Sequence, residues 1–334
     1  MPLAAMVIGM MSGCGQLSEE DGFGPGQEWV HDPSRLVEED GAWYVYGSGT
    51  NGVALTRSRV DLETGAIYSE AGLDADALTA GWWEDVQEWN PTGEFDAPSV
   101  SPDGRFLAFT VFDEGEEGIQ DATGLAVRTA GGWQPGGVIL ASAGEAPETP
   151  RAMDASFVTT DEGTFLVFGS HAGGIYVTEL DPETGLMLDD GDTVDTSEAP
   201  QRFVRIANDP EEGIEAATVH VHDGWHYLFV NKGSCCRGVD STYYVVMGRS
   251  RDLMGPYLDG EGVDLVDGGG RAFLDAEGRY LGPGHVGISE TRDGTVMSVH
   301  FYDRDDSGTS KLLVRSLDWS DDEWPVPGDI VAEH

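Results

Sequence analysis

A pattern of polar and apolar positions recurs five times along the chain. Each copy has a polar residue, a few small residues, an apolar run, a turn of the DG or EG kind, and a second apolar run. Two apolar runs joined by such a turn predict a β-hairpin. The copies are HDPSRLVEEDGAWYVYG (31–47), FDAPSVSPDGRFLAFTV (95–111), MDASFVTTDEGTFLVFG (153–169), IEAATVHVHDGWHYLFV (214–230) and GHVGISETRDGTVMSVHF (284–301).

Further strand-like runs follow each hairpin, and helical periodicity is nearly absent. GVALTRSRVD and TGAIYSE follow the first copy, and GLAVRTAGGW and GVILAS follow the second. Four short strands in a unit that repeats roughly every 60 residues are typical of an antiparallel blade. We therefore predict an all-β fold, a five-bladed β-propeller with four-stranded antiparallel blades, over residues 29–334.

The polar residues that open the copies are expected to converge, because the first strand of each propeller blade lines the central channel. A single Asp at a strand start commonly bonds nearby backbone N–H groups in an Asx turn. Acids at matching positions in separate repeats favour an active site instead. One protonated and one ionised carboxyl are the basic equipment for glycoside hydrolysis. The opening residues are Asp32, Asp96, Asp154, Glu215 and His285.

Composition narrows the choice of partners. The chain carries 61 acidic and 18 basic residues, for a net charge of −43, and Lys232 and Lys311 are its lysines. Such a surface repels phosphate backbones, so nucleic-acid binding is excluded. The acidic residues are interpreted as a solvated shell that preserves solubility.

The N-terminus resembles an export signal. Residues 3–11 form a short apolar run, and Ser12 and Gly13 precede Cys14 as in a bacterial lipobox. We predict a signal and lipobox segment over residues 1–14 and a flexible tether over residues 15–28. An ordinary secretory signal or an unstructured tail is the alternative.

The other two cysteines and three of the histidines lack the arrangement of a metal site. Cys235 and Cys236 are adjacent and cannot supply the spacing of a zinc site. They form either a vicinal disulfide or two small buried thiols. The histidines share one hairpin without a zinc-like set around them, and we predict no metal there: they are His220, His222 and His226.

The motifs resemble those of glycoside hydrolase family 43, most closely its endo-arabinanase branch. The most specific stretch is YLFVNKGSCCRGVDSTYYVVMGRSRDLMGPYLD, and the resemblance covers nearly everything after residue 28. The other carrying motifs are HDPS at 31–34, MDAS at 153–156, IEA at 214–216, GPGH at 282–285 and the closing DW and WP pairs at 318–319 and 324–325.

This resemblance implies catalytic roles by position. Asp32 would be the general base that activates water, Glu215 the general acid, and Asp154 the residue that orients Glu215 and raises its pKa. The family inverts configuration, which implies base and acid carboxyls roughly 6.5–9.5 Å apart. His285 would lie near a channel metal, usually calcium and then largely water-coordinated, or would only form hydrogen bonds within the channel.

The positions expected to hold the sugar depart from the family. Asp96, after Phe95, stands where an aromatic precedes Ala-Pro, Ser99 replaces an acid, and His171 with Ala172 replaces a Trp. Trp82, Trp83 and Trp89 offer either a replacement sugar platform or outer-surface packing. Arg237 bonds either a substrate hydroxyl or a structural carboxylate. The predicted substrate-binding residues are His31, Phe95, Asp96, His171 and Arg237.

We therefore expect an exported inverting glycoside hydrolase, lipid-anchored at Cys14 or secreted, that cleaves (1→5)-α-L-arabinan internally. Its expected partner is a plant-type polysaccharide or arabino-oligosaccharide. An exo-acting α-L-arabinofuranosidase or β-xylosidase is the alternative among enzymes. The alternative outside enzymes is a non-catalytic carbohydrate-binding propeller.

Overall fold

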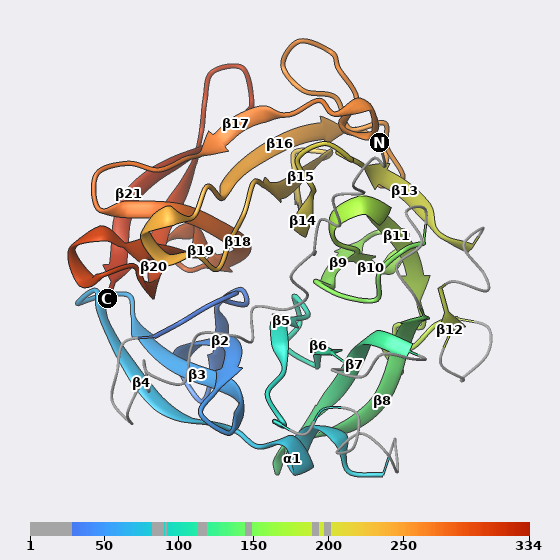
Figure 1. Cartoon of the computed structure of the whole chain (residues 1–334), viewed down its shortest axis with the longest axis vertical. Coiled ribbons are helices and arrows are strands. Elements are labelled where there is room, and N and C mark those ends of the chain that lie inside the picture. The colour runs from blue at the N-terminus through green and yellow to red at the C-terminus, as the bar shows by residue number, and fades with distance from the viewer. Residues whose placement is uncertain are drawn as a thin grey trace, which may run out of the picture.

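Five sheets surround one axis, as Figure 1 shows. This computed structural model describes residues 29–81, 90, 92–112, 119–143, 149–188, 194–196 and 202–334. The prediction of an all-β five-bladed propeller with four-stranded antiparallel blades is confirmed. The predicted signal and tether (1–14 and 15–28), with Cys14, and the tryptophans Trp82, Trp83 and Trp89 lie outside the described residues.

Each blade is built from strands that are consecutive or nearly so in sequence. The first blade holds β1 (Val37–Glu39), β2 (Ala42–Thr50), β3 (Val53–Asp61) and β4 (Ala66–Leu73). The second holds β5 (Asp96–Val100), β6 (Phe106–Phe112), β7 (Ile119–Thr129) and β8 (Gly132–Ala143). The third holds β9 (Ser156–Thr160), β10 (Gly163–Phe168), β11 (Ile175–Leu180) and β13 (Val204–Ala207).

The last two blades follow the same plan. The fourth holds β14 (Glu215–His222), β15 (Trp225–Lys232), β16 (Tyr244–Ser250) and β17 (Arg271–Leu274). The fifth holds β18 (Tyr280–Thr291), β19 (Gly294–Asp303), β20 (Thr309–Trp319) and β21 (Pro325–Glu333). The short helices are α1 (Ala75–Thr79), η1 (His171–Gly173), η3 (Gly238–Asp240), η4 (Leu265–Asp267) and η5 (Arg304–Asp306).

Two details bear on the strand prediction. The second blade gains a fifth strand, β12 (Val194–Asp195), which runs parallel to the outer strand β8. Two of the DG pairs form the expected tight turns, since both residues have positive φ in Asp40-Gly41 (49° and 81°) and in Asp223-Gly224 (48° and 72°). A two-residue turn with both φ values positive matches the twist of a hairpin.

The hydrophobic core lies between neighbouring blades rather than within any one of them. Five clusters of buried residues occur, each drawing on two adjacent blades. The cluster between the last and first blades includes Val45, Val60, Leu312 and Val314. Because the first blade consists only of strands β1 to β4 and the last only of β18 to β21, side-chain packing closes the ring without a shared strand.

Candidate active site

The inner strands share an unusual backbone conformation where they approach the axis. At this point of each blade, one non-glycine residue has φ between 45° and 56°. L-residues rarely adopt this left-handed region, and its recurrence marks a place where the fold imposes strain. These five residues are Asp32, Ala97, Asp154, Ala216 and His285.

This set corrects the repeat alignment by one residue in two blades. Asp32, Asp154 and His285 occupy the left-handed position themselves. Asp96 and Glu215 instead come one residue earlier, in front of Ala97 and Ala216. A register shift follows Glu215 and Asp96 in their strands, so the inner strand bulges there. Carboxyls therefore reach the channel from two neighbouring positions of the repeat: the left-handed residue and the residue before it.

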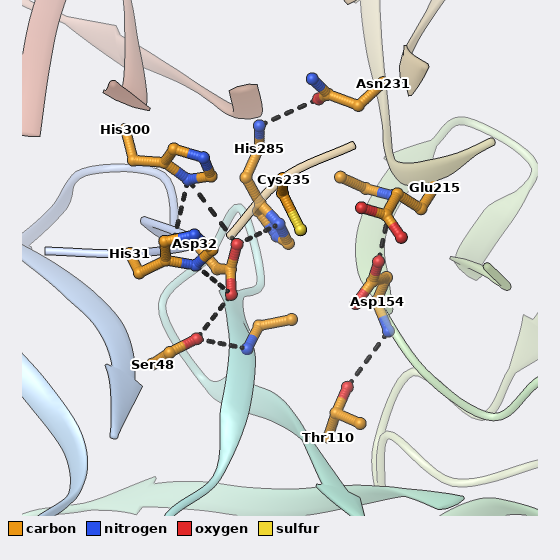
Figure 2. Close-up of polar contacts among 12 residues, drawn as sticks. His31, Asp32, Ser48, Thr110, Asp154, Glu215, Asn231, Cys235, His285 and His300 are labelled. Atoms are coloured by element: carbon orange, nitrogen blue, oxygen red, sulfur yellow. Dashed lines mark hydrogen bonds and ion pairs between the residues drawn. The ribbon is translucent and has the colours of Figure 1, made fainter. Parts of the chain in front are cut away.

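Histidine and serine side chains surround the carboxylate of Asp32. The residue is 9% exposed. Its Oδ2 lies 2.8 Å from His31 Nδ1 and accepts a hydrogen bond from the Ser48 hydroxyl at 2.7 Å. Its Oδ1 lies 3.3 Å from His285 Nδ1. Figure 2 shows these side chains gathered around the Asp32 carboxylate.

These contacts determine the protonation of Asp32. Burial alone would raise the pKa of this carboxyl, but the facing imidazoles of His31 and His285, with their hydrogen bonds, hold it well below its usual range. Asp32 is therefore ionised at neutral pH. An ionised carboxylate is what a general base requires.

His31 supports Asp32 and is itself buried. It is 4% exposed, and its Nε2 lies 2.7 Å from the Tyr302 hydroxyl. Its ring stacks on His300, with centroids 4.1 Å apart, and His300 Nδ1 accepts the Asp32 backbone N–H at 3.2 Å. The imidazole of His31 thus holds the carboxylate of Asp32 and has little surface left for the predicted contact with sugar.

Glu215 and Asp154 form a second acidic group. The Glu215 side chain is 12% exposed, and its Oε2 accepts a hydrogen bond from the Ser170 hydroxyl at 3.0 Å. Asp154 Oδ2 accepts the backbone N–H of Ala216 at 3.2 Å, and its own N–H donates to Thr110 at 3.1 Å. Figure 2 shows this pair on the opposite side of the site from Asp32, with His285 and Cys235 between them.

The second group holds a proton that the first does not. Burial, and then the charge of Glu215, raise the pKa of Asp154 to about 8. Because two adjacent buried carboxyls compete for one proton, this titration belongs to the pair. Asp96 is a further acid beside Asp32: burial and the charge of Asp32 raise its pKa to about 7. The site therefore joins an ionised base to carboxyls that retain protons near neutrality.

His285 lies between the two acidic groups (Figure 2). It lines a narrow cavity of about 20 Å³ to which all five blades contribute, room for little more than one water molecule. Asn231 accepts its backbone N–H at 3.0 Å. Burial disfavours the charged ring, but the carboxylate of Asp32 raises the pKa of His285 above its usual value. The inner strands thus converge on one point, as predicted.

A metal could bind near Asp32, but the donors suit calcium poorly. Ligand atoms of His31, Asp32 and His300 lie within 4.8 Å of one another, close enough to hold an ion. Calcium takes six to eight oxygen ligands, whereas this group offers two imidazoles and one carboxylate. His285 adds only another imidazole. We therefore derive no step through a calcium ion.

The remaining predicted residues are dispersed. Phe95 is fully buried and stacks on Phe109, with centroids 5.0 Å apart, so it has no surface to offer a sugar. Its apolar ring fills the core between the first two blades. Arg237 is exposed beside η3, and its backbone N–H donates to Ser241. His171 lies at the acid pair, with Nε2 3.1 Å from Glu215 Oε2.

The cysteine pair and the histidines of the fourth hairpin lie in surroundings that lower their reactivity. The sulfur atoms of Cys235 and Cys236 lie 2.7 Å apart. Burial raises the pKa of the Cys235 thiol well above its usual range. His222 stacks on Trp319 at 3.8 Å, and burial lowers the pKa of His220 to about 4.

Residues that the sequence analysis missed surround both acids. Ser48 and Ser170 each donate to a carboxylate, and both belong to a Gly-Ser pair, within the last residues of β2 and directly after β10. A Cβ on Gly47 would lie 2.8 Å from the carbonyl oxygen of His31, so glycine allows the close approach. The repeated Gly-Ser was therefore a usable signal. No comparable repeated motif in the sequence points to the other neighbours of Asp32 and His31, which are His300 and Tyr302.

The propeller and its site define a class of protein. A propeller whose channel mouth sets an ionised carboxylate opposite a carboxyl pair that retains a proton has the groups needed for acid and base catalysis on a glycosidic bond. The sequence agrees, because residues 26–325 match the model of glycosyl hydrolases family 43. The chain belongs to this family.

Individual relatives narrow the class to arabinanase-like hydrolases. The chain is 29% identical over 338 residues to an extracellular endo-α-(1→5)-L-arabinanase of Bacillus subtilis, covering 96% of this chain and 95% of the relative. It is 28% identical over 322 residues to an extracellular exo-α-(1→5)-L-arabinofuranosidase of Cellvibrio japonicus, covering 89% and 85%. The structure of a Cellvibrio cellulosa α-L-arabinanase complexed with arabinohexaose superposes with a TM-score of 0.73 at 25% identity, covering 90% and 96%.

Among the residues that the structure describes, no helix has both the length and the apolar character needed to cross a bilayer.

Proposed function

We propose that the protein hydrolyses α-L-arabinofuranosyl linkages, and in particular cleaves (1→5)-α-L-arabinan internally. The observation that carries this proposal is the placement of two acidic groups, with pKa shifts in opposite directions, on opposite sides of the site. Asp32 is held ionised, while the pair of Glu215 and Asp154 retains a proton. Water deprotonation and leaving-group protonation require these two states at the same pH.

Each residue then has one task. Glu215 donates its proton to the leaving oxygen as the bond to the anomeric carbon breaks. Asp32 takes a proton from the water that attacks this carbon from the opposite face, which inverts the configuration. Asp154 is a positioning residue: its Oδ2 accepts the N–H of Ala216, next to Glu215, and its charge helps the pair keep a proton.

An assay on linear arabinan tests the proposal. We expect Asp32→Asn and Glu215→Gln to lower kcat by roughly a hundredfold or more, since general acid–base catalysis contributes about 10²–10⁴-fold. The matched control is Asp103→Asn, an exposed acid in the β5–β6 turn, which should behave as the parent. Parent-level hydrolysis by Glu215→Gln would overturn the proposal.

Exo-cleavage is the second candidate, supported by the exo-acting relative and by the altered sugar-contacting positions. Asp96 and His171 place polar groups where aromatic rings were expected. Product length over time separates the candidates: internal cleavage gives mixed oligosaccharides early, and terminal cleavage gives one short product throughout. A binding-only propeller would take up arabinohexaose without releasing any product.

We also propose export, because both reported relatives are extracellular enzymes. Cys14 is the proposed lipid attachment site. Palmitate incorporation into the full chain, absent from Cys14→Ala, would support the anchor. Release of an unlabelled parent protein into the medium would favour simple secretion.

The predicted calcium is testable independently of the mechanism. Activity lost on dialysis against EDTA and restored by calcium chloride would support a calcium site near His285. Activity unchanged by the chelator would contradict it.

A further inference from the structure

Inverting hydrolysis leaves its two carboxyls in exchanged states. After one turnover the acid has lost a proton and the base has gained one, so a proton must reach the acid before the next cycle. The acid is shielded here: the Glu215 side chain is 12% exposed. If the protein has the function proposed above, on which this inference rests, a path must exist by which Glu215 regains its proton.

One imidazole connects Glu215 with solvent. His171 Nε2 lies 3.1 Å from Glu215 Oε2, and the His171 side chain is 56% exposed. Imidazole is the side chain that both gains and releases protons near neutral pH, and it carries a nitrogen at each end for transfer. His171 thus presents one end to the catalytic acid and a large surface to water.

The backbone holds this imidazole in place. The N–H of His171 donates to the carbonyl of Ile214, the residue before Glu215, at 2.7 Å, and His171 has a positive φ of 54°. Gly213 leaves room for the ring, since a Cβ there would lie 3.1 Å from His171 Nδ1. The loop around η1 is therefore fastened to the strand that bears the acid.

We propose that His171 returns a proton from solvent to Glu215 after each turnover. In the step, the protonated ring transfers its Nε2 proton to the Glu215 carboxylate and becomes neutral. A buffer acid, which can reach the exposed ring, then protonates the ring again. Asp32 separately releases to water the proton taken from the attacking water molecule, so the cycle closes without a net change in the enzyme.

Turnover rates make such a relay useful. Diffusion limits direct protonation by hydronium to on the order of 10² s⁻¹ at pH 8, taking an encounter rate of about 10¹⁰ M⁻¹s⁻¹. Enzymes of this kind turn over at roughly 1–10³ s⁻¹. Unassisted return of the proton would therefore limit a fast enzyme, and more severely as pH rises.

Other groups around the acid are poorly suited to this task. The hydroxyl of Ser170 donates to the same oxygen but does not titrate near neutrality. Asp154 shares the proton of the pair, and its N–H and Oδ2 are engaged inside the channel. The titratable groups that face Glu215 from the neighbouring elements are Asp154, His171, Cys235, Tyr243 and His285.

The test compares single-turnover with steady-state hydrolysis of arabinohexaose. The variant His171→Gln keeps an amide donor near Glu215 but cannot carry a proton. With enzyme in excess, its first turnover should proceed within about twofold of the parent rate, because a first turnover needs no proton to be returned to the acid. Its steady-state kcat at pH 8 should fall about tenfold, with the deficit growing as pH rises.

Rescue and control variants complete the test. Added imidazole should restore the steady-state kcat of His171→Ala in proportion to its concentration. His222→Ala removes an imidazole that stacks on Trp319, away from the acids, and should leave both rates unchanged. An equal loss in both regimes would reduce His171 to a positioning residue and overturn the relay, as would an unchanged kcat. Absence of hydrolysis by the parent protein would instead refute the proposed function.

Discussion

Asp32 and Asp154 share one backbone conformation and one place in their blades, yet the pKa of Asp32 is lowered and that of Asp154 is raised. Their neighbours cause the difference. Asp32 faces the imidazoles of His31 and His285, which stabilise its charged form. Asp154 is buried beside another acid, Glu215, which destabilises its charged form.

The hydroxyl of Ser48 offers a direct test of the first environment. It donates to Asp32 Oδ2, so Ser48→Ala removes a bond to the ionised form and should raise the pKa of Asp32. A general base with a raised pKa becomes protonated at higher pH. The acidic limb of the kcat/KM profile should therefore move up by about one to two pH units, given about 1.5–3 kcal/mol for a charged hydrogen bond.

Ser310→Ala is the matched control for this profile. Ser310 is also buried, but its hydroxyl donates to the carbonyl of Val30 rather than to an acid. Its acidic limb should coincide with that of the parent protein. An unmoved limb in Ser48→Ala would contradict the assignment of Asp32 as base.

Asp154→Asn tests the second environment. The substitution removes the charge that helps the acid pair hold a proton, so the pair should lose that proton at lower pH. The basic limb of the kcat/KM profile should move to lower pH, and kcat should fall by roughly tenfold to a hundredfold. A basic limb at the parent position would show that Asp154 does not influence the proton of the pair.

At the residue level, the convergence of the repeat-opening side chains was predictable, because the repeat itself carried the signal. Asp32, Asp154, Glu215 and His285 open four copies, and the structure brings them to one channel. Tyr302 could not be predicted in the same way. It reaches His31 from the fifth blade, and only closure of the ring brings those two residues together.

At the level of elements, the strands were predictable and their register was not. The DG turns fixed where each hairpin reverses. A bulge in the inner strand changes which residue takes the left-handed conformation, and apolar periodicity does not reveal it. The alignment consequently placed Asp96 and Glu215 one residue away from their true equivalents, His31 and Met153.

The left-handed position should tolerate side chains unequally. Ala97 has φ of 48° and is 2% exposed, so Ala97→Val forces a β-branched residue into a disfavoured conformation. We expect a loss of about 1–2 kcal/mol beyond the cost of crowding, measured as a lower urea midpoint. Ala155→Val, at an equally buried neighbour of Asp154, isolates the crowding cost. Equal losses in both variants would contradict strain at this position.

At the scale of the whole molecule, packing and hydrogen bonds close the ring without a shared strand. The backbone N–H of Val30 donates to the carbonyl of Ser310, and the cluster of Val45, Val60, Leu312 and Val314 fills the seam. His31 and Asp32 follow Val30 directly, and His300 and Tyr302 lie in the adjoining blade. The seam of the propeller therefore also assembles the base.

Leu312→Ala should weaken this seam. Leu312 is fully buried, and its truncation is expected to cost about 2–5 kcal/mol. Amide hydrogen exchange should rise most in β2 and β20, on the two sides of the seam. Leu166→Ala, equally buried between the second and third blades, should leave those two strands protected. If amide exchange rose in the same strands in both variants, the seam would not open independently of the other blade contacts.

The central claim is that Asp32 and Glu215 act from opposite sides of the bond as base and acid. Proton NMR of the sugar released from α-(1→5)-linked arabino-oligosaccharide, recorded before mutarotation, tests it most directly. The account predicts that the β-anomer appears first, because water attacks opposite the leaving oxygen. Initial release of the α-anomer would contradict it.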